Sequence, residues 1–251
     1  MSEIEGSLQR SDGHRLAWRR VEGRAPTVLW LGGFASDMTG TKASDLAAWA
    51  RDAGQDYLRF DYLGHGASTG EFADGTITRW REDALQVLDD LVQGDAVLVG
   101  SSMGGWIACL LAMARPGRIR GLVLIAPAPD FTEKLIWPNL TAEQRRTIQA
   151  EGVWIMPSEH EPPGIPISRG LIEDGARWSI LGSAIPITAP VRILQGREDV
   201  EVPWRHALSL FHEIESQDAV FSLIKDGDHR LSRPQDLERI RATVAELANP
   251  G

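Results

Sequence analysis

The chain has 251 residues, of which 43% are hydrophobic and 24% are charged, a composition that predicts a folded globular protein without long disordered stretches. Acidic residues outnumber Lys and Arg by 35 to 26, and the net charge of -9 disfavours nucleic acid or an anionic membrane surface as a partner. The N-terminal residues show no signal or transit peptide and no apolar run is long enough to span a membrane, so we expect a soluble cytoplasmic protein.

The first predicted element is a β-hairpin on the edge of a sheet, with Ser11–His14 as its turn. Short aliphatic runs then alternate with amphipathic stretches, and most of these runs are continuous, as in parallel strands covered on both faces. The strand-like runs lie at 28–31, 57–60, 96–99, 122–125, 191–194 and 219–224. This alternation predicts an α/β fold with about eight strands in a mostly parallel sheet and helices on both faces.

Helices are predicted at 76–94, where Gly94 can end the helix, at 104–115, and from a capping box formed by Ser232 and Gln235. The helix at 104–115 contains the single cysteine, Cys109, which cannot form an internal disulfide. Its apolar neighbours indicate a core residue and not a nucleophile.

The alternation is interrupted at 129–189, where no strand is apparent. A capping box at Thr141 and Gln144 begins a polar helix that ends near Gly152. The stretch is too long for a plain loop and too short for an independent domain. We therefore expect one domain, 1–251, with 129–189 as an inserted helical cap.

The segment Gly100–Gly104 matches the pattern G-x-S-x-G, in which a strand turns sharply into a helix and leaves a serine at the apex. The flanking glycines remove Cβ atoms that would clash in such a turn. A predicted strand precedes the pattern and a predicted helix follows it. Ser102, and not its neighbour Ser101, occupies the apex and is the predicted nucleophile.

A serine nucleophile requires a base, and the base requires an orienting carboxylate. With this turn the chain order is serine, then acid, then histidine, each just past the end of a strand. Among the histidines, His229 alone follows a late strand; the others are His14, His65, His160, His206 and His212. Asp199, three residues after Gly196, is the predicted acid, with Glu198 and Glu201 as rivals, whereas Asp226 and Asp228 lie too close to His229 in sequence.

The negative oxygen that develops during acyl transfer requires two N–H donors. The first expected donor is the backbone N–H of Met103, directly after the nucleophile. The second is Phe34 or a neighbouring residue in the turn after the strand at 28–31, because Gly32 and Gly33 let the backbone approach the site.

Several longer stretches resemble the branch of the α/β-hydrolase-domain family that includes the mitochondrial palmitoyl-protein thioesterase, also described as an acyl-glucuronide esterase. The matching stretches are 33–43, 59–62, 100–106, 152–158, 202–204 and 228–230. The resemblance implies an α/β-hydrolase fold and hydrolysis of acyl thioesters or esters by Ser102, Asp199 and His229. His65 lies in a stretch that resembles the wider superfamily's turn after the fourth strand, and we interpret it as structural.

The predicted chemistry is two-step acyl transfer on a small-molecule or acyl-protein substrate, without a metal or organic cofactor. Trp137, Trp154 and Trp178 either form the wall of an acyl pocket or hold the cap onto the body. Two alternatives remain open. One is an esterase for small soluble esters or acyl-glucuronide-type conjugates, and the other is a ligand-binding protein that keeps the fold without turnover.

Overall fold

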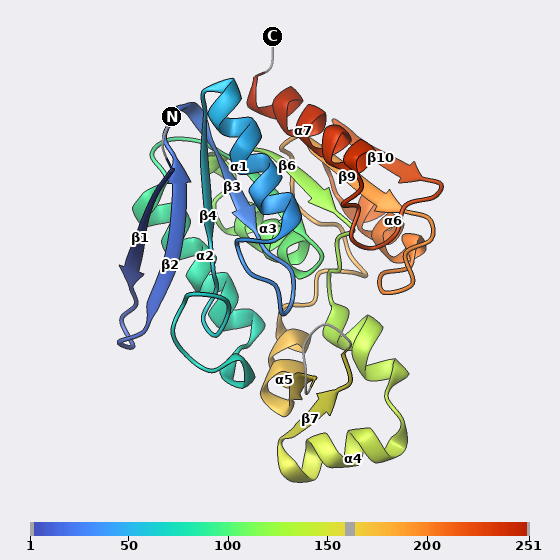
Figure 1. Ribbon diagram of the computed structural model, residues 1–251. Helices are drawn as coiled ribbons and strands as arrows, with labels where there is room; N and C mark the ends of the chain where they lie inside the picture. The colour runs from blue at the N-terminus through green and yellow to red at the C-terminus, as the bar shows by residue number, and fades with distance from the viewer. Residues whose placement is uncertain (1–2, 159–163, 250–251) are drawn as a thin grey trace.

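In the computed structural model, which describes residues 3–158 and 164–249, eight strands form one sheet in the order β1-β2-β4-β3-β5-β6-β9-β10 (Figure 1). The strands are β1 Glu3–Gln9, β2 Arg15–Val21, β3 Arg24–Leu31, β4 Gln55–Phe60, β5 Ala96–Ser101, β6 Ile119–Ile125, β9 Val191–Gly196 and β10 Ala219–Ile224. The β1–β2 and β2–β4 pairs are antiparallel, and the pairs from β4 through to β10 are parallel. The predicted mostly parallel sheet and its edge hairpin are confirmed.

Helices cover both faces of this sheet. On one face α1 (Thr41–Ala53) and α7 (Pro234–Ala248) bury an apolar layer against the strands. On the other face α2 (Ile77–Leu91), α3 (Met103–Ala114) and α6 (Trp204–Glu213) do the same. Short 3-10 turns lie at Phe72–Asp74 and Pro116–Arg118.

Cys109 lies in the core layer under α3, fully buried. Burial raises the pKa of its thiol to about 12, so the group is uncharged at neutral pH. A thiol without thiolate character is a weak nucleophile. These surroundings agree with the role in the core that the sequence predicts.

Two predicted helix ends differ from the structure. α7 begins at Pro234, and the carboxylate of Asp236 accepts hydrogen bonds from the backbone N–H and the guanidinium of Arg233. The predicted capping box of Ser232 and Gln235 is therefore wrong, because the proline at the first helical position moves the helix start by one residue. α2 likewise ends at Leu91, before Gly94.

Residues 129–189, the segment predicted to be an insertion and called the cap below, lie between β6 and β9 in the chain and beneath the sheet in Figure 1. The cap contains a π-helical turn Thr132–Ile136, a 3-10 turn Trp137–Asn139, α4 (Ala142–Glu151), β7 (Val153–Met156), β8 (Ile165–Ser168) and α5 (Arg169–Arg177). The capping box at Thr141 and the left-handed Gly152 that ends α4 are confirmed. The expectation of a strand-free segment is wrong, because β7 and β8 form an antiparallel hairpin. His160 lies outside the described residues.

Two carboxylates of the cap, the buried Asp130 and the partly buried Asp174, accept hydrogen bonds that position it. Asp130, at the start of the cap, accepts hydrogen bonds from the hydroxyl of Ser179 at 2.6 Å and from the backbone N–H of Ile180 at 2.8 Å. Asp174 of α5 accepts the backbone N–H and the hydroxyl of Thr78 in α2, each at 2.7 Å. These bonds join the two ends of the cap to each other and fix α5 on the first turn of α2.

Candidate active site

Ser102 sits at the apex of the turn between β5 and α3, with φ +55° and ψ −117°. This conformation is strained for a residue with a side chain and persists only where the surroundings enforce it. Here the N–H of Ser102 donates to Ile125 and its carbonyl accepts from Ala128. A Cβ on Gly100 or Gly104 would collide with the neighbouring backbone, so both glycines of the motif are required sterically. The side chain of Ser102 is thereby presented beyond the carboxyl end of β5.

Asp199 and His229 are brought together from the loops after β9 and β10. The Nδ1 atom of His229 lies 2.8 Å from the Oδ2 atom of Asp199. The carboxylate is 0% exposed, whereas the imidazole is 17% exposed. A carboxylate can only accept, so Nδ1 carries the proton and Nε2 is left as the basic nitrogen, which is the tautomer that a general base requires.

Asp199 is held by further donors that the sequence does not reveal. The Nε2 amide of Gln195, buried in β9, donates to its Oδ2 atom at 3.0 Å. The backbone N–H groups of Glu201 and Val202 donate to its Oδ1 atom at 3.0 and 2.8 Å. The carboxylate is therefore fixed in orientation before it meets His229. Gln195 was missed because one amide in an apolar strand carries no local signal.

The rival carboxylates have other partners. Glu198 pairs with Arg197 at 2.6 Å, Asp226 pairs with the arginine that precedes α7, and Asp228 accepts from the backbone of its own loop. Glu201 does approach His229, but on the opposite side of the ring, with its Oε2 atom 3.6 Å from Nε2. Asp199 is thus the carboxylate that meets Nδ1.

The loop that carries His229 is braced from α1. The Nζ atom of Lys42 donates to the carbonyl of Arg230 at 2.5 Å. Leu231, with φ +45°, is fully buried in the apolar layer that contains Ala43 of the same helix. Burial lowers the pKa of Lys42 to about 8. The bond from Lys42 joins residues 188 positions apart, so no local pattern could predict it.

The predicted oxyanion donors flank Ser102. A Cβ built on Gly33 would lie 3.5 Å from the Cβ of Ser102, so the turn that contains Phe34 passes directly beside the nucleophile. Ser36 closes this turn by donating its hydroxyl to the carbonyl of Gly33 at 2.8 Å. Met103 is the first residue of α3, where backbone N–H groups have no partner within the helix.

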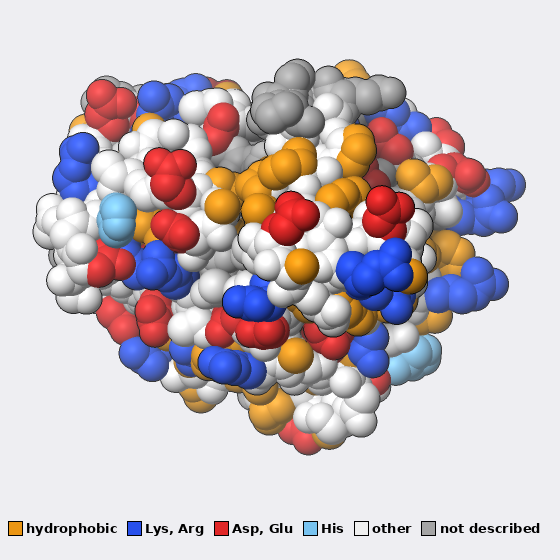
Figure 2. Space-filling view, turned by 90° about the horizontal axis from the view of Figure 1, so that it is seen from below, with side chains coloured by type: hydrophobic (Ala, Val, Ile, Leu, Met, Phe, Trp, Pro, Cys, Tyr) orange, Lys and Arg blue, Asp and Glu red, His pale blue; other side chains and the backbone are white. Residues whose placement is uncertain are grey.

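The three tryptophans predicted for the cap fall into two groups. Trp137 and Trp154 pack against the apolar cluster inside the cap, which Phe34 also contacts from the body. Trp178 instead donates its indole N–H to Thr78 at 2.7 Å, and the guanidinium of Arg81 covers its ring. Figure 2 shows apolar side chains gathered on the underside of the molecule. Ile155 of β7, in the cap, is 42% exposed.

Other histidines are occupied elsewhere. His65 is buried with its Nδ1 atom 3.2 Å from the carbonyl of Leu63, and burial lowers its pKa to about 4. The Nε2 atom of His206 lies 2.7 Å from the carbonyl of Pro129. Burial lowers the pKa of His206 as well. Both rings are therefore neutral at physiological pH.

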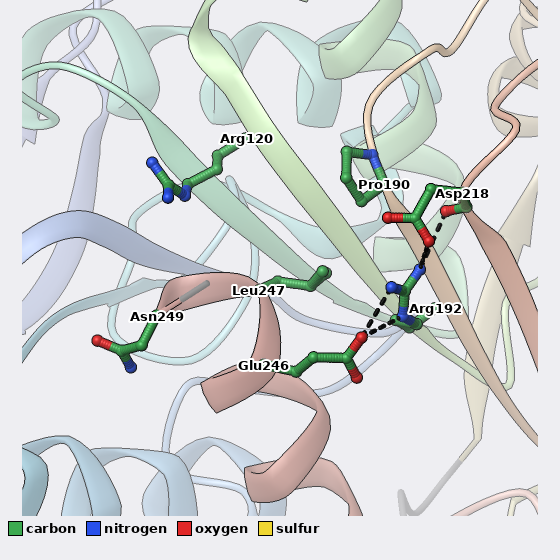
Figure 3. Close-up of a pocket in the computed structure, with 7 residues that line it drawn as sticks. All are labelled: Arg120, Pro190, Arg192, Asp218, Glu246, Leu247 and Asn249. Carbon is green, nitrogen blue, oxygen red and sulfur yellow. Dashed lines mark hydrogen bonds and ion pairs between the residues drawn. The ribbon is translucent and has the colours of Figure 1, made fainter. Parts of the chain in front are cut away.

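A surface hollow of about 520 Å³ lies at the opposite end of the sheet, next to the first residues of β6, β9 and β10 (Figure 3). Within it Arg192 is paired with Asp218 at 2.8 Å and with Glu246 at 2.7 Å. Its charges therefore compensate one another, and ligand sites of such sheets lie at the carboxyl ends of the strands instead. Across the described parts of the chain, no three His, Cys, Asp or Glu side chains gather as metal ligands.

Comparison with known proteins gives consistent matches. The model of the alpha/beta hydrolase fold family matches residues 26–156. Mouse "Palmitoyl-protein thioesterase ABHD10, mitochondrial" is 37% identical over 243 residues, which cover 96% of this chain and 81% of that relative. The human protein of the same name is 34% identical over 241 residues, covering 96% of this chain and 78% of that relative.

Solved structures agree with these matches. A candidate hydrolase from Agrobacterium vitis S4 superposes with a TM-score of 0.94 at 43% identity, covering 99% of this chain and 100% of that one. Mouse alpha/beta hydrolase domain-containing protein 10 superposes with a TM-score of 0.89 at 35% identity, covering 97% of this chain and 98% of that one. The mammalian relatives are named as mitochondrial, so the cytoplasmic location expected here stays a prediction. In residues 3–158 and 164–249 no helix is both long and apolar enough to cross a membrane.

Proposed function

This chain belongs to the α/β-hydrolase family of ester and thioester hydrolases, and we propose that it cleaves acyl thioesters or carboxylic esters through Ser102, Asp199 and His229. The observation that carries the proposal is the 2.8 Å contact between His229 and the buried Asp199, which follow β10 and β9 at the same carboxyl edge of the sheet as the strained turn of Ser102 after β5. A palmitoyl-thioesterase-like substrate is the finer form of this proposal, and it is supported by the names of the relatives.

The mechanism begins when Nε2 of His229 takes the proton of the Ser102 hydroxyl, and the oxygen attacks the acyl carbonyl. Asp199 stabilises the imidazolium that forms, because Gln195 and two backbone N–H groups already hold its carboxylate in orientation. The N–H groups of Phe34 and Met103 receive the negative oxygen. The imidazolium then protonates the departing alcohol or thiol, and water releases the acid by the same route.

In this proposal the acyl chain lies between the cap and the body, against the apolar side chains of Trp137, Trp154 and Phe34. The contacts of Trp178 with Thr78 and Arg81 favour its alternative role, that of holding the cap onto the body. An apolar chain next to this surface gains affinity for each methylene that leaves water.

The test is kcat/KM for matched oxygen esters and thioesters of increasing acyl length, with Ser102→Ala as the blank. Each methylene that enters an apolar pocket contributes about 0.8 kcal/mol, or roughly a fourfold change in kcat/KM. A thioester rate that climbs to long chains supports the palmitoyl-thioesterase-like form. A maximum at short chains without thioester preference would make the protein an esterase for small soluble esters.

A serine-directed fluorophosphonate separates both enzymes from a binding protein that lacks turnover. The folded protein is expected to be labelled at Ser102, and Ser102→Ala is expected to be unlabelled. Absence of labelling in the folded wild-type protein would contradict the proposal.

A further inference from the structure

Glu201 places a second carboxylate beside His229, on the side of the ring away from Asp199. Its Oε2 atom lies 3.6 Å from Nε2, whereas Asp199 occupies Nδ1 at 2.8 Å. The two carboxylates differ in exposure, since the side chain of Glu201 is 66% exposed and that of Asp199 is 0% exposed. The backbone N–H of Glu201 also donates to Asp199 at 3.0 Å, so the predicted acid itself holds the backbone from which the Glu201 side chain extends.

The nitrogen that Glu201 approaches is the one that must deliver a proton to the leaving group. When the bond from Ser102 to the acyl carbon forms and the bond from that carbon to sulfur or oxygen breaks, the proton passes from Ser102 through Nε2 to the departing atom. The leaving group therefore lies beside Nε2, while the acyl chain points elsewhere. A charged side chain next to Nε2 acts on the leaving group and not on the acyl chain.

We propose that Glu201 is a specificity-determining residue that disfavours anionic leaving groups and favours neutral or cationic ones. This inference rests on the proposed function, because it assigns the leaving-group side of the same site. The substrates it selects are acyl thioesters or esters whose alcohol or thiol part carries no negative charge near the scissile bond.

Further charged groups surround the His229 loop, and Glu201 acts among them. Lys42 lies close to Asp228, Glu201 and Arg230, and its ammonium group is committed to the carbonyl of Arg230. Asp228, on the His229 loop, carries a negative charge that offsets the positive charge of Lys42. Arg230 is exposed and is the cation there that would act against Glu201.

The experiment uses three butyryl thioesters with one acyl group and different thiols: thiocholine (cationic), 2-mercaptoethanol (neutral) and 3-mercaptopropionate (anionic). Release of thiol gives kcat/KM for each substrate, at low and at high salt. For each variant, the kcat/KM of each charged substrate is divided by the kcat/KM of the neutral substrate. Comparison of variants with wild type cancels the intrinsic reactivity of the three thiols.

The variant is Glu201→Gln, and the matched control is Glu198→Gln, which removes the same charge three residues away. Glu198 is 60% exposed and paired with Arg197, so its loss tests a general change in net charge. Glu201→Gln is expected to lower the cationic-to-anionic ratio about three- to tenfold at low salt, as for an exposed charge a few ångströms from another. The change should shrink at high salt, because exposed charges are screened.

An unchanged ratio in Glu201→Gln, or an equal change in Glu198→Gln, would overturn the assignment of leaving-group selection to Glu201. Arg230→Gln is expected to raise the ratio, and a fall in that variant would overturn the assignment as well. If wild type releases no thiol from any of the three substrates or from longer acyl thioesters, the proposed function itself is rejected. Its failure is thus distinguishable from failure of the Glu201 assignment alone.

Discussion

The body and the cap are held together in different ways. In the body, the loops after β5, β9 and β10 are fixed by hydrogen bonds to backbone and to buried side chains, and Asp199 alone accepts from His229, Gln195 and two backbone N–H groups. The cap has a small apolar cluster of its own, its two ends are joined to each other by Asp130, and Asp174 bonds it to Thr78 of the body. The groups proposed for catalysis, which need a fixed geometry, therefore lie on the body, and the surface proposed for an acyl chain lies where the two regions meet.

The largest expected effect comes from removing the charge of the body's acid. Asp199→Asn should lower kcat roughly 10⁴-fold, because a neutral amide neither holds Nδ1–H of His229 nor stabilises the imidazolium. The fold should persist, since the amide oxygen can still accept from Glu201 and Val202. The measurements are steady-state kinetics and thermal unfolding, with Glu198→Gln as the matched control. Near-normal turnover would reject Asp199 as the acid and leave Glu201 as the candidate.

The second prediction loosens the junction between the two ends of the cap and leaves the body intact. Asp130→Ala removes the acceptor of the buried Ile180 N–H and of the part-buried bonds from Ser179 and Leu181, and should cost about 3 kcal/mol in the free energy of unfolding. Asp130→Asn should cost less, because it keeps an acceptor and tolerates the left-handed backbone of this position, φ +53°.

Urea unfolding of both variants checks this prediction, and fluorophosphonate labelling of Ser102 under native conditions shows whether the body is preserved. Labelling close to that of wild type is expected, since the carboxylate of Asp130 bonds to Ser179, Ile180 and Leu181 and not to the triad. Two variants within about 0.5 kcal/mol of wild type would mean that the bonds of Asp130 between the two ends of the cap do not stabilise the protein.

The body was more predictable from sequence than the cap for a physical reason. Continuous apolar runs define strands that are buried on both faces, and the glycines around Ser102 are required by local sterics. The hairpin of β7 and β8 was missed because each strand has four residues and pairs only with the other, with Pro166 inside one of them. Such pairing depends on a partner elsewhere in the chain and not on local propensity.

The same distinction applies within the candidate site. The chain order and strand ends were enough to select Asp199 and His229, which the structure places in contact. The side chains that support them, Gln195 and Lys42, act through single hydrogen bonds whose partners depend on the folded sheet. A polar residue in a strand or at a helix start has many possible partners in sequence, and only the tertiary structure selects one.

The third prediction concerns the stability of the body at low pH. His65 is buried and neutral, with a pKa lowered to about 4, whereas an unfolded chain takes up the proton near pH 6.5. The contribution of neutral His65 to the free energy of unfolding is therefore complete above pH 6.5 and is lost as the pH falls toward 4. The loss is about 2 kcal/mol at pH 5 relative to pH 7.5.

The measurement is the free energy of unfolding at pH 7.5 and pH 5 for wild type and His65→Gln. The glutamine can still donate to the carbonyl of Leu63, which also accepts the indole N–H of Trp80 at 3.1 Å. The variant should lose less stability between the two pH values than wild type does. An equal loss in both proteins would show that His65 takes up its proton in the folded body.

The smallest effect distinguishes the two groups of tryptophans where cap and body meet. Trp154→Leu removes part of the apolar surface that Phe34 shares with the cap, so the long-chain to short-chain ratio of kcat/KM should fall by roughly fourfold for each methylene of the acyl chain that returns to water. Trp178→Phe removes the hydrogen bond to Thr78 and should cost about 1 kcal/mol in the free energy of unfolding, with the chain-length ratio unchanged. If Trp178→Phe lowers that ratio as much as Trp154→Leu does, both tryptophans form the acyl surface, and Asp174 holds the cap on the body without help from Trp178.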